Sequence, residues 1–190
     1  MKLLIVLLFC LVSLFGEKLE WNKLNDEQKE NAIKVYQIAK EYDLAQTMLA
    51  IAWQESRLGK IPINLEDKAS CGVHHIHIKT FLWQNNLKNT ITSRNKYCAE
   101  LIQDVELSTR NAIKYYKYSL KKWKNNQQKA IMSYNVGFDL VKHKTAGKKY
   151  YKNVKQHIAE AKDIINEIEK NSELETFLKE FASLNLELEQ

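Results

Sequence analysis

The chain has 190 residues, with 29 basic and 23 acidic side chains and a formal net charge of +6. This length fits one domain of ordinary size with a sizeable core and argues against a chain of several domains. One Pro and five Gly favour long helices with few tight turns, and the sequence shows neither period-two alternation nor an internal repeat, so β-rich and repeat folds are excluded.

The first segment has the layout of a secretory signal peptide over residues 1–16. Lys2 precedes an apolar run from Leu3 to Phe15, and polar sequence begins at Glu17. The run is shorter than the about 20 residues that a membrane-spanning helix needs. We therefore expect an exported protein, periplasmic or associated with the cell envelope, with a retained N-terminal anchor as the alternative.

Capping residues and apolar periodicity predict two helices after the leader. Asn25 is expected to cap a helix that runs to about residue 41. Asp43 is expected to cap a second helix that runs to about residue 58, where Gly59 ends it.

Further helices are predicted over 77–86, over 96–124 as one or two helices, over 127–136 and over 148–170, with loops at 60–76 and 88–94. Val73–Ile78 is the one strand candidate. A capping box of Ser172 and Glu175 predicts a separate last helix. The last 35 residues are expected to pack on the domain, with a partner helix as the alternative.

The second predicted helix carries a carboxyl group on its apolar face. Glu55 recurs at helical spacing with apolar side chains, namely Leu44, Met48, Ile51 and Ala52. A partly buried carboxyl holds its proton more readily than one in water, and such a group can protonate a leaving group. The structural alternative is a glutamate at the edge of the stripe, paired with a basic side chain such as Arg57.

Four short motifs follow one another at defined separations: Glu55-Ser56, then the stretches 70–76 (SCGVHHI), 130–137 (AIMSYNVG) and 150–154 (YYKNV). In this order they resemble the catalytic domain of the soluble lytic transglycosylases of bacteria, over about residues 30–158. The resemblance implies a mainly α, lysozyme-like helical domain over 17–158 with an irregular active-site loop. A C-terminal helical extension would follow over 159–190.

The resemblance also assigns roles to single residues. It makes Glu55 the catalytic acid and base, and it places Tyr134 and Asn135 across the cleft from it. Tyr150 would reach towards Glu55 or the sugar, although Tyr151 is its direct neighbour.

Within the loop, Ser70 and Gly72 would shape the entry for the glycan, and His75 stands where the family has Gln. A neutral imidazole accepts one hydrogen bond and donates another, as an amide does. A protonated His75 would favour the ionised form of Glu55 and spoil the general acid. We therefore expect activity to fall below about pH 6, near the ordinary pKa of histidine.

The three histidines of the loop, His74, His75 and His77, also suggest a metal site, because alternate residues of a strand share a face and imidazole binds zinc. No further Cys or His completes the set at a firm ligand spacing. We therefore favour polar loop residues, and expect neither a metal nor another cofactor.

Two cysteines, Cys71 and Cys98, remain once the leader is removed. In an exported chain they suggest one disulfide, with two free thiols as the alternative.

The resemblance implies an exported enzyme that cleaves the bond between N-acetylmuramic acid and N-acetylglucosamine in peptidoglycan and closes a 1,6-anhydro ring. Its partners would be glycan strands and, as an open second class, secretion-apparatus proteins, and the chain would be a monomer. A hydrolytic goose-type muramidase and a non-catalytic glycan-binding or secretion module are the alternatives.

Lysines mixed with aromatics at 114–124 and 142–155 would suit nucleic acid, but an exported protein rarely meets it, and a solvated helix face is the simpler interpretation.

Overall fold

The computed structural model describes residues 18–188 apart from Leu65 and Lys68, with the side chains of 175–188 left aside. The predicted signal peptide lies outside the described residues, so its cleavage or retention stays a prediction. Within the described part of the chain, no helix is both long and apolar enough to cross a bilayer.

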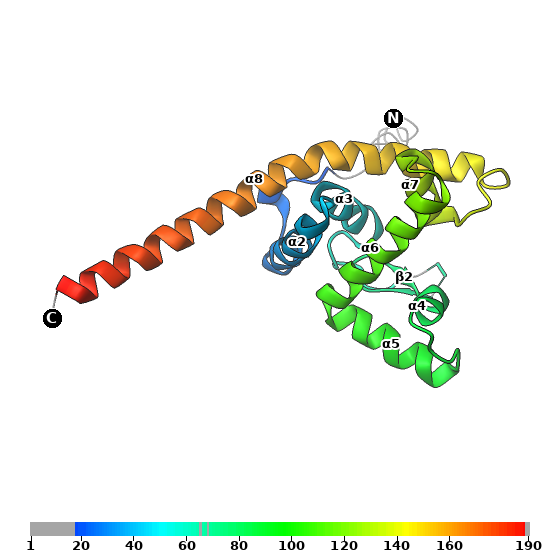
Figure 1. Cartoon of the computed structure of the whole chain (residues 1–190), viewed down its shortest axis with the longest axis horizontal. Helices are drawn as coiled ribbons and strands as arrows, with labels where there is room; N and C mark the ends of the chain where they lie inside the picture. The colour runs from blue at the N-terminus through cyan, green and yellow to red at the C-terminus, as the bar shows by residue number, and fades with distance from the viewer. Residues whose placement is uncertain (1–17, 65, 68, 189–190) are drawn as a thin grey trace, which may run out of the picture.

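The chain is built almost entirely of helices, which confirms the mainly α fold (Figure 1). In chain order the elements are η1 (Trp21–Lys23), α2 (Asp26–Ala39), η2 (Lys40–Tyr42), α3 (Ala45–Ser56), β1 (Ser70–Cys71), β2 (Ile76–His77), α4 (Ile78–Gln84), α5 (Ile91–Gln103), α6 (Val105–Lys122), α7 (Gln127–Val136) and α8 (Lys144–Leu188). The two short strands pair antiparallel, with Ser70 opposite His77.

Helix α3 forms the centre of the core. Every residue from Met48 to Trp53 is 2% exposed or less. A helix that is apolar on all sides has to be surrounded by other elements, and α2, α6 and α8 pack around it. Its last turn, which carries Glu55, lies at the edge of this core.

The local signals predicted some helix boundaries and missed others. Asn25 caps α2 through the predicted capping box with Gln28, and α7 has the predicted bounds. The prediction that Asp43 caps α3 is wrong, because Asp43 takes a left-handed φ of 57° and ends η2 instead. Leu44 then occupies the N-cap of α3 without a side-chain hydrogen bond.

Two predictions for the middle of the chain need correction. The strand expected at Val73–Ile78 is instead a pair of two-residue strands on either side of a turn. The loop expected at 88–94 ends sooner, because Thr90 caps α5 by accepting a hydrogen bond from the backbone of Ser93. The long predicted helical stretch up to residue 124 is two helices, α5 and α6.

Helix α8 is continuous through Ser172, so the separate last helix predicted there is wrong. Neither Gly nor Pro occurs between Lys148 and Leu188, and nothing interrupts the backbone hydrogen bonds. The helix is buried on one side as far as Ile168, and its C-terminal part extends beyond the other helices (Figure 1). The division of the chain at residue 158 falls inside this helix and stays a prediction.

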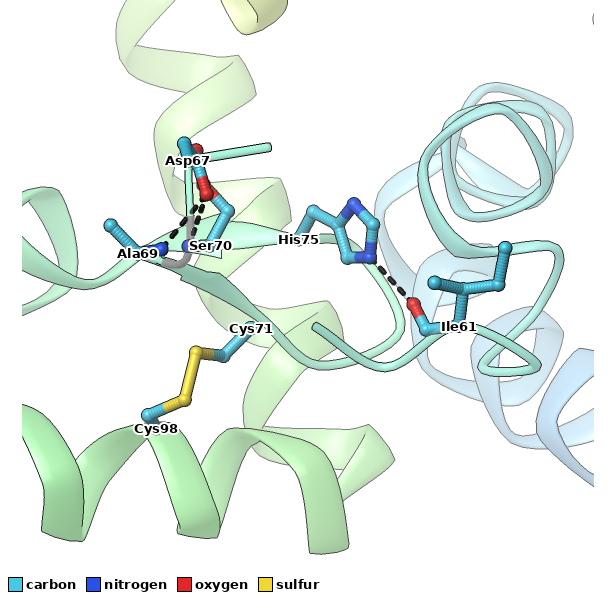
Figure 2. Close-up of a disulfide and its surroundings, with 7 residues drawn as sticks. All are labelled: Ile61, Asp67, Ala69, Ser70, Cys71, His75 and Cys98. Carbon is cyan, nitrogen blue, oxygen red and sulfur yellow. Dashed lines mark hydrogen bonds between the residues drawn. A yellow bond between two sulfur atoms is a disulfide. The ribbon is translucent and has the colours of Figure 1, made fainter. Parts of the chain in front are cut away.

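The turn between the strands is anchored to α5. A disulfide joins Cys71 of β1 to Cys98 of α5, with Cα atoms 5.4 Å apart (Figure 2). Gly72 follows with a φ of +82°, and an added Cβ there would lie 2.3 Å from the carbonyl oxygen of Leu101 and 2.9 Å from Ser108 Oγ. The close approach of this turn to α5 and α6 therefore requires glycine.

We predict that Cys71 and Cys98 are bridged in protein exported to an oxidising compartment, and that the double variant Cys71→Ser/Cys98→Ser unfolds more readily. Closing a loop of 27 positions restricts the unfolded chain, which is worth about 3 kcal/mol. Intact-mass analysis after alkylation in denaturant, without and with reductant, measures the bridge, and urea unfolding measures the stability. Alkylation of both sulfurs without reductant would contradict the prediction.

Candidate active site

Glu55 lies in the last turn of α3, where the buried helix reaches a cavity. Its side chain is 14% exposed. The cavity has a volume of about 420 Å³, and Glu55 contributes to its lining together with His75, Tyr134 and Asn135. The structure thus brings together residues from three separate motifs of the sequence.

Ser56 ties the end of α3 to the turn between the two strands. Its hydroxyl is buried and donates a hydrogen bond to the carbonyl oxygen of Val73 at 2.6 Å. The hydroxyl oxygen of Ser56 also accepts a hydrogen bond from the backbone N–H of Gly59 at 2.7 Å. The residue after the carboxyl therefore holds the loop against the helix.

The chain leaves α3 through three consecutive residues with positive φ, namely Arg57, Leu58 and Gly59 at 55°, 56° and 92°. The backbone carbonyls of Arg57 and Leu58 accept hydrogen bonds from the side chains of Gln28 and Asn31 in α2, at 2.8 and 2.9 Å. These bonds satisfy polar groups at a buried helix end, and they hold the last turn of α3 in place.

Tyr150 of α8 contacts the carboxyl directly. Its hydroxyl donates a hydrogen bond to Glu55 Oε1 at 2.5 Å, and the two residues are 95 positions apart in the sequence. Burial and the nearby charge of Glu55 raise the pKa of Tyr150 well above 10. The phenol therefore stays protonated and remains a donor. The hydrogen bond thus favours Tyr150 over its neighbour Tyr151 as the tyrosine that reaches Glu55.

His75 lies on the other side of the carboxyl, with Nδ1 at 3.6 Å from Glu55 Oε2. Its Nε2 lies 2.6 Å from the carbonyl oxygen of Ile61 (Figure 2). Because a carbonyl only accepts, Nε2 carries the hydrogen and Nδ1 faces Glu55. The neutral ring thus presents a lone pair to the carboxyl, and the protonated ring presents a positive N–H.

The surroundings of His75 act on its pKa in opposite directions. Burial alone would lower the pKa, but the contacts with Glu55 and with the carbonyl of Ile61, and the nearby negative charges, outweigh burial and raise it above 6.5. The backbone of His75 has a φ of 43°, which few residues other than glycine adopt.

Tyr134 and Asn135, at the end of α7, line the cavity from another helix. The hydroxyl of Tyr134 donates to the carbonyl oxygen of His74 at 3.0 Å, so this ring also holds the turn in place. Burial, followed by the charge of Glu55, raises the pKa of Tyr134 well above 10. Asn135 is exposed to the cavity.

The rest of the wall contains residues that no motif indicated, namely Asn64, Glu66, Asp67, His77, Thr80, Gln84 and Tyr115. Asp67 accepts hydrogen bonds from the backbone of Ala69 at 2.8 Å and of Ser70 at 3.0 Å, and from Ser70 Oγ at 2.7 Å (Figure 2). Burial alone would raise the pKa of Asp67, but these hydrogen bonds lower it. Ser70, a predicted site residue, also lines the cavity, whereas Gly72 is buried and is not part of the lining.

The three histidines of the loop do not converge. His74 is fully buried in the core, and burial lowers its pKa to about 3. His77 is exposed, with Nδ1 at 3.4 Å from Thr80 Oγ1. Among the residues that the structure describes, no group of three or more His, Cys, Asp or Glu side chains is placed to hold a metal ion.

The site is thus a shielded carboxyl at the end of the central helix of a mainly α fold, open to a cavity. The sequence model of the family described as "Transglycosylase SLT domain" matches residues 33–158. Since this match covers well over half of the chain, the chain belongs to the peptidoglycan lytic transglycosylase family. No curated protein and no solved structure matches the chain.

We predict that Ser56→Ala destabilises the fold by about 1–3 kcal/mol, because it leaves a buried carbonyl and a backbone N–H without their partner. The shift of the urea midpoint measures this loss. Thr92→Ala, at an exposed position of α5, is the control and should change the stability by less than about 0.5 kcal/mol. Equal midpoints for Ser56→Ala and wild type would show that the hydroxyl does not hold the loop.

Proposed function

We propose that this protein is an exported peptidoglycan lytic transglycosylase with Glu55 as its single general acid and base. The substrate bond joins N-acetylmuramic acid to N-acetylglucosamine, and the product carries a 1,6-anhydro ring. The observation that carries the proposal is the shielded carboxyl of Glu55, held between Tyr150 and His75 at the wall of the cavity.

The distribution of the other carboxyl groups supports a single-acid reaction. Hydrolysing glycosidases use two carboxyl groups, one on each side of the bond. The described cavity wall holds two further acids, Glu66 and Asp67. The oxygens of Asp67 already accept three hydrogen bonds, which makes it a poor base. Glu66 is exposed.

The chemistry needs a proton on Glu55 at the start. Because the phenol of Tyr150 occupies Oε1, the transferred proton belongs on Oε2, on the side of His75. Glu55 donates it to the glycosidic oxygen, and the bond from that oxygen to the muramyl C1 breaks. The muramyl C6 hydroxyl then attacks C1 and gives its proton to the Glu55 carboxylate. The ring closes, the acid is restored, and no water is consumed.

The residues of this chain contribute orientation to that sequence of steps. Tyr150 holds one carboxyl oxygen, Ser56 and Tyr134 hold the loop, and Asn135 presents an amide to the glycan. Holding the C6 hydroxyl close to C1 replaces an encounter with water by an intramolecular attack, which lowers the entropic cost of reaching the transition state. Neither a metal nor an organic cofactor has a part in these steps.

A hydrolytic muramidase is the second candidate, because Glu66 also lines the cavity and could activate a water molecule. Secretion-apparatus proteins remain a proposed second class of partner. We also propose that the protein acts as a monomer. It would act outside the cytoplasm, because peptidoglycan lies there.

We predict that purified wild-type protein releases muropeptides with 1,6-anhydromuramic ends, and that Glu55→Gln releases none. Glutamine keeps the shape of the side chain but has no proton to give. Mass spectrometry of products from isolated cell walls measures both outcomes. Glu66→Gln is the matched control and should keep the anhydro products. Reducible muramic ends from the wild type, abolished in Glu66→Gln, would instead assign the protein to the hydrolases.

We predict that wild-type activity declines as the pH falls through the pKa of His75, which lies above 6.5. Below that pKa the ring is positive, and its Nδ1–H faces Oε2 and competes for the oxygen that has to carry the transferred proton. The decline should thus begin at a higher pH than the value of about 6 taken from an unperturbed histidine. His75→Gln should extend activity to lower pH, whereas His143→Gln, at an exposed position, should not. Superimposable pH–rate profiles for wild type and His75→Gln would contradict the prediction.

A further inference from the structure

A second, shallower cavity lies beside the candidate active site, between the end of α4 and α6. It has a volume of about 310 Å³ and is lined by Trp83, Gln84, Asn86, Lys114 and Tyr118. Trp83 is 62% exposed and Tyr118 is 42% exposed. Burying such rings in the core would stabilise the fold, so large aromatic side chains left open to solvent in a hollow are typical of a binding surface. We refer to these five residues as the outer platform.

The outer platform is continuous with the cleft of Glu55. Gln84 lines both cavities. A row of aromatic rings also connects them, and the ring pairs from the cleft outward are Tyr134–Tyr115, Tyr115–Phe138, Phe138–Tyr118 and Tyr118–Trp83, with centroids 5.7, 5.9, 5.6 and 5.9 Å apart. A polymer that lies across Glu55 therefore has a path along this row to Trp83.

The geometry of the platform suits a sugar ring. Trp83 and Tyr118 meet at 72°, so they form a corner and do not cover each other as a stack would. A pyranose has an apolar C–H face, which packs on the electron-rich face of an aromatic ring, and a polar rim of hydroxyl groups. Gln84, Asn86 and Lys114 supply hydrogen-bonding groups around the corner.

Lys114 is held in place at the rim of the corner. Its ammonium group donates a hydrogen bond to the backbone carbonyl of Gln84 at 2.6 Å. An ammonium has three N–H groups, so donors remain for a hydroxyl, an acetamido oxygen or a carboxylate of the polymer. Neighbouring lysines of α6 lie over aromatic rings instead, Lys117 over Tyr42 and Lys122 over Phe138. One lysine at the platform is too few for a phosphate backbone, whose binding depends on many neutralising contacts.

We propose that the outer platform binds a further N-acetylated amino sugar of the same glycan strand that lies at Glu55. This inference rests on the proposed function, since it assumes a glycan in the cleft. The platform then raises the affinity for long glycan strands and does not change the affinity for short ones. The occupant is a neutral sugar ring on Trp83, with Lys114 at its polar edge.

The test measures binding without cleavage, in the full chain carrying Glu55→Gln. Isothermal titration with linear β-1,4-linked N-acetylglucosamine oligomers, from the disaccharide to the hexasaccharide, gives affinity as a function of length. Adding Trp83→Ala should weaken hexasaccharide binding about fivefold, as expected for the loss of one aromatic stacking contact. Disaccharide binding should not change. Trp83→Phe should keep most of the affinity, and Ile91→Ala, which removes an exposed apolar side chain of α5, should keep all of it.

Several outcomes would overturn the inference. One is equal hexasaccharide affinity with and without Trp83, and another is equal weakening for every length, which would place the effect in the cleft. A Trp83-dependent dimer in sedimentation, or Trp83-dependent binding of a single-stranded oligonucleotide without any dependence on glycan, would assign the platform to another partner. None of these readouts requires turnover. The proposed function is tested separately, because it fails if the wild type releases no muropeptides with 1,6-anhydromuramic ends.

Discussion

The hydrogen bond from Ser56 to the carbonyl of Val73 is the contact on which the arrangement of the site depends. Helix α3 is buried on all sides and is therefore a rigid base. Contacts from several helices hold the turn that follows β1, among them the Ser56 hydroxyl on Val73, the Tyr134 hydroxyl on His74 and the disulfide to α5. These restraints come from three different helices, and together they bring the imidazole of His75 to the carboxyl of Glu55.

The positions of protons around Glu55 follow from this arrangement. Tyr150 keeps its proton because burial and a nearby negative charge both oppose ionisation. His75 has its Nε2 proton assigned by the carbonyl of Ile61, and only Nδ1 is free to change. The carboxyl thus lies between a permanent neutral donor and a group whose charge depends on pH. An amide at position 75 would supply hydrogen bonds without that dependence.

The sequence stretch that mixes lysines with aromatics has two different faces in the structure. Tyr115 lines the cleft and Tyr116 is buried in the core, while the lysines around them are exposed. The interpretation as a solvated helix face therefore describes the lysines alone. The aromatic side of the same helix continues the cleft towards Trp83. One helix thereby supplies both core packing and part of the outer platform that we propose as a binding surface for the polymer.

The sequence alone determined the features that depend on residues within one helical turn of each other. The capping of α2 by Asn25, the bounds of α7 and the place of Glu55 on an apolar face all belong to this kind. Local signals failed where the neighbouring element decided, as at Asp43, which ends η2, and at Ser172, which lies inside α8. The family resemblance predicts that Tyr150 reaches towards Glu55 or the sugar, and the tertiary structure places its hydroxyl on Glu55 across 95 positions. Only the tertiary structure set Trp83 against Tyr118. Contacts between distant segments depend on how whole helices pack against one another, and no local pattern of residues records that packing.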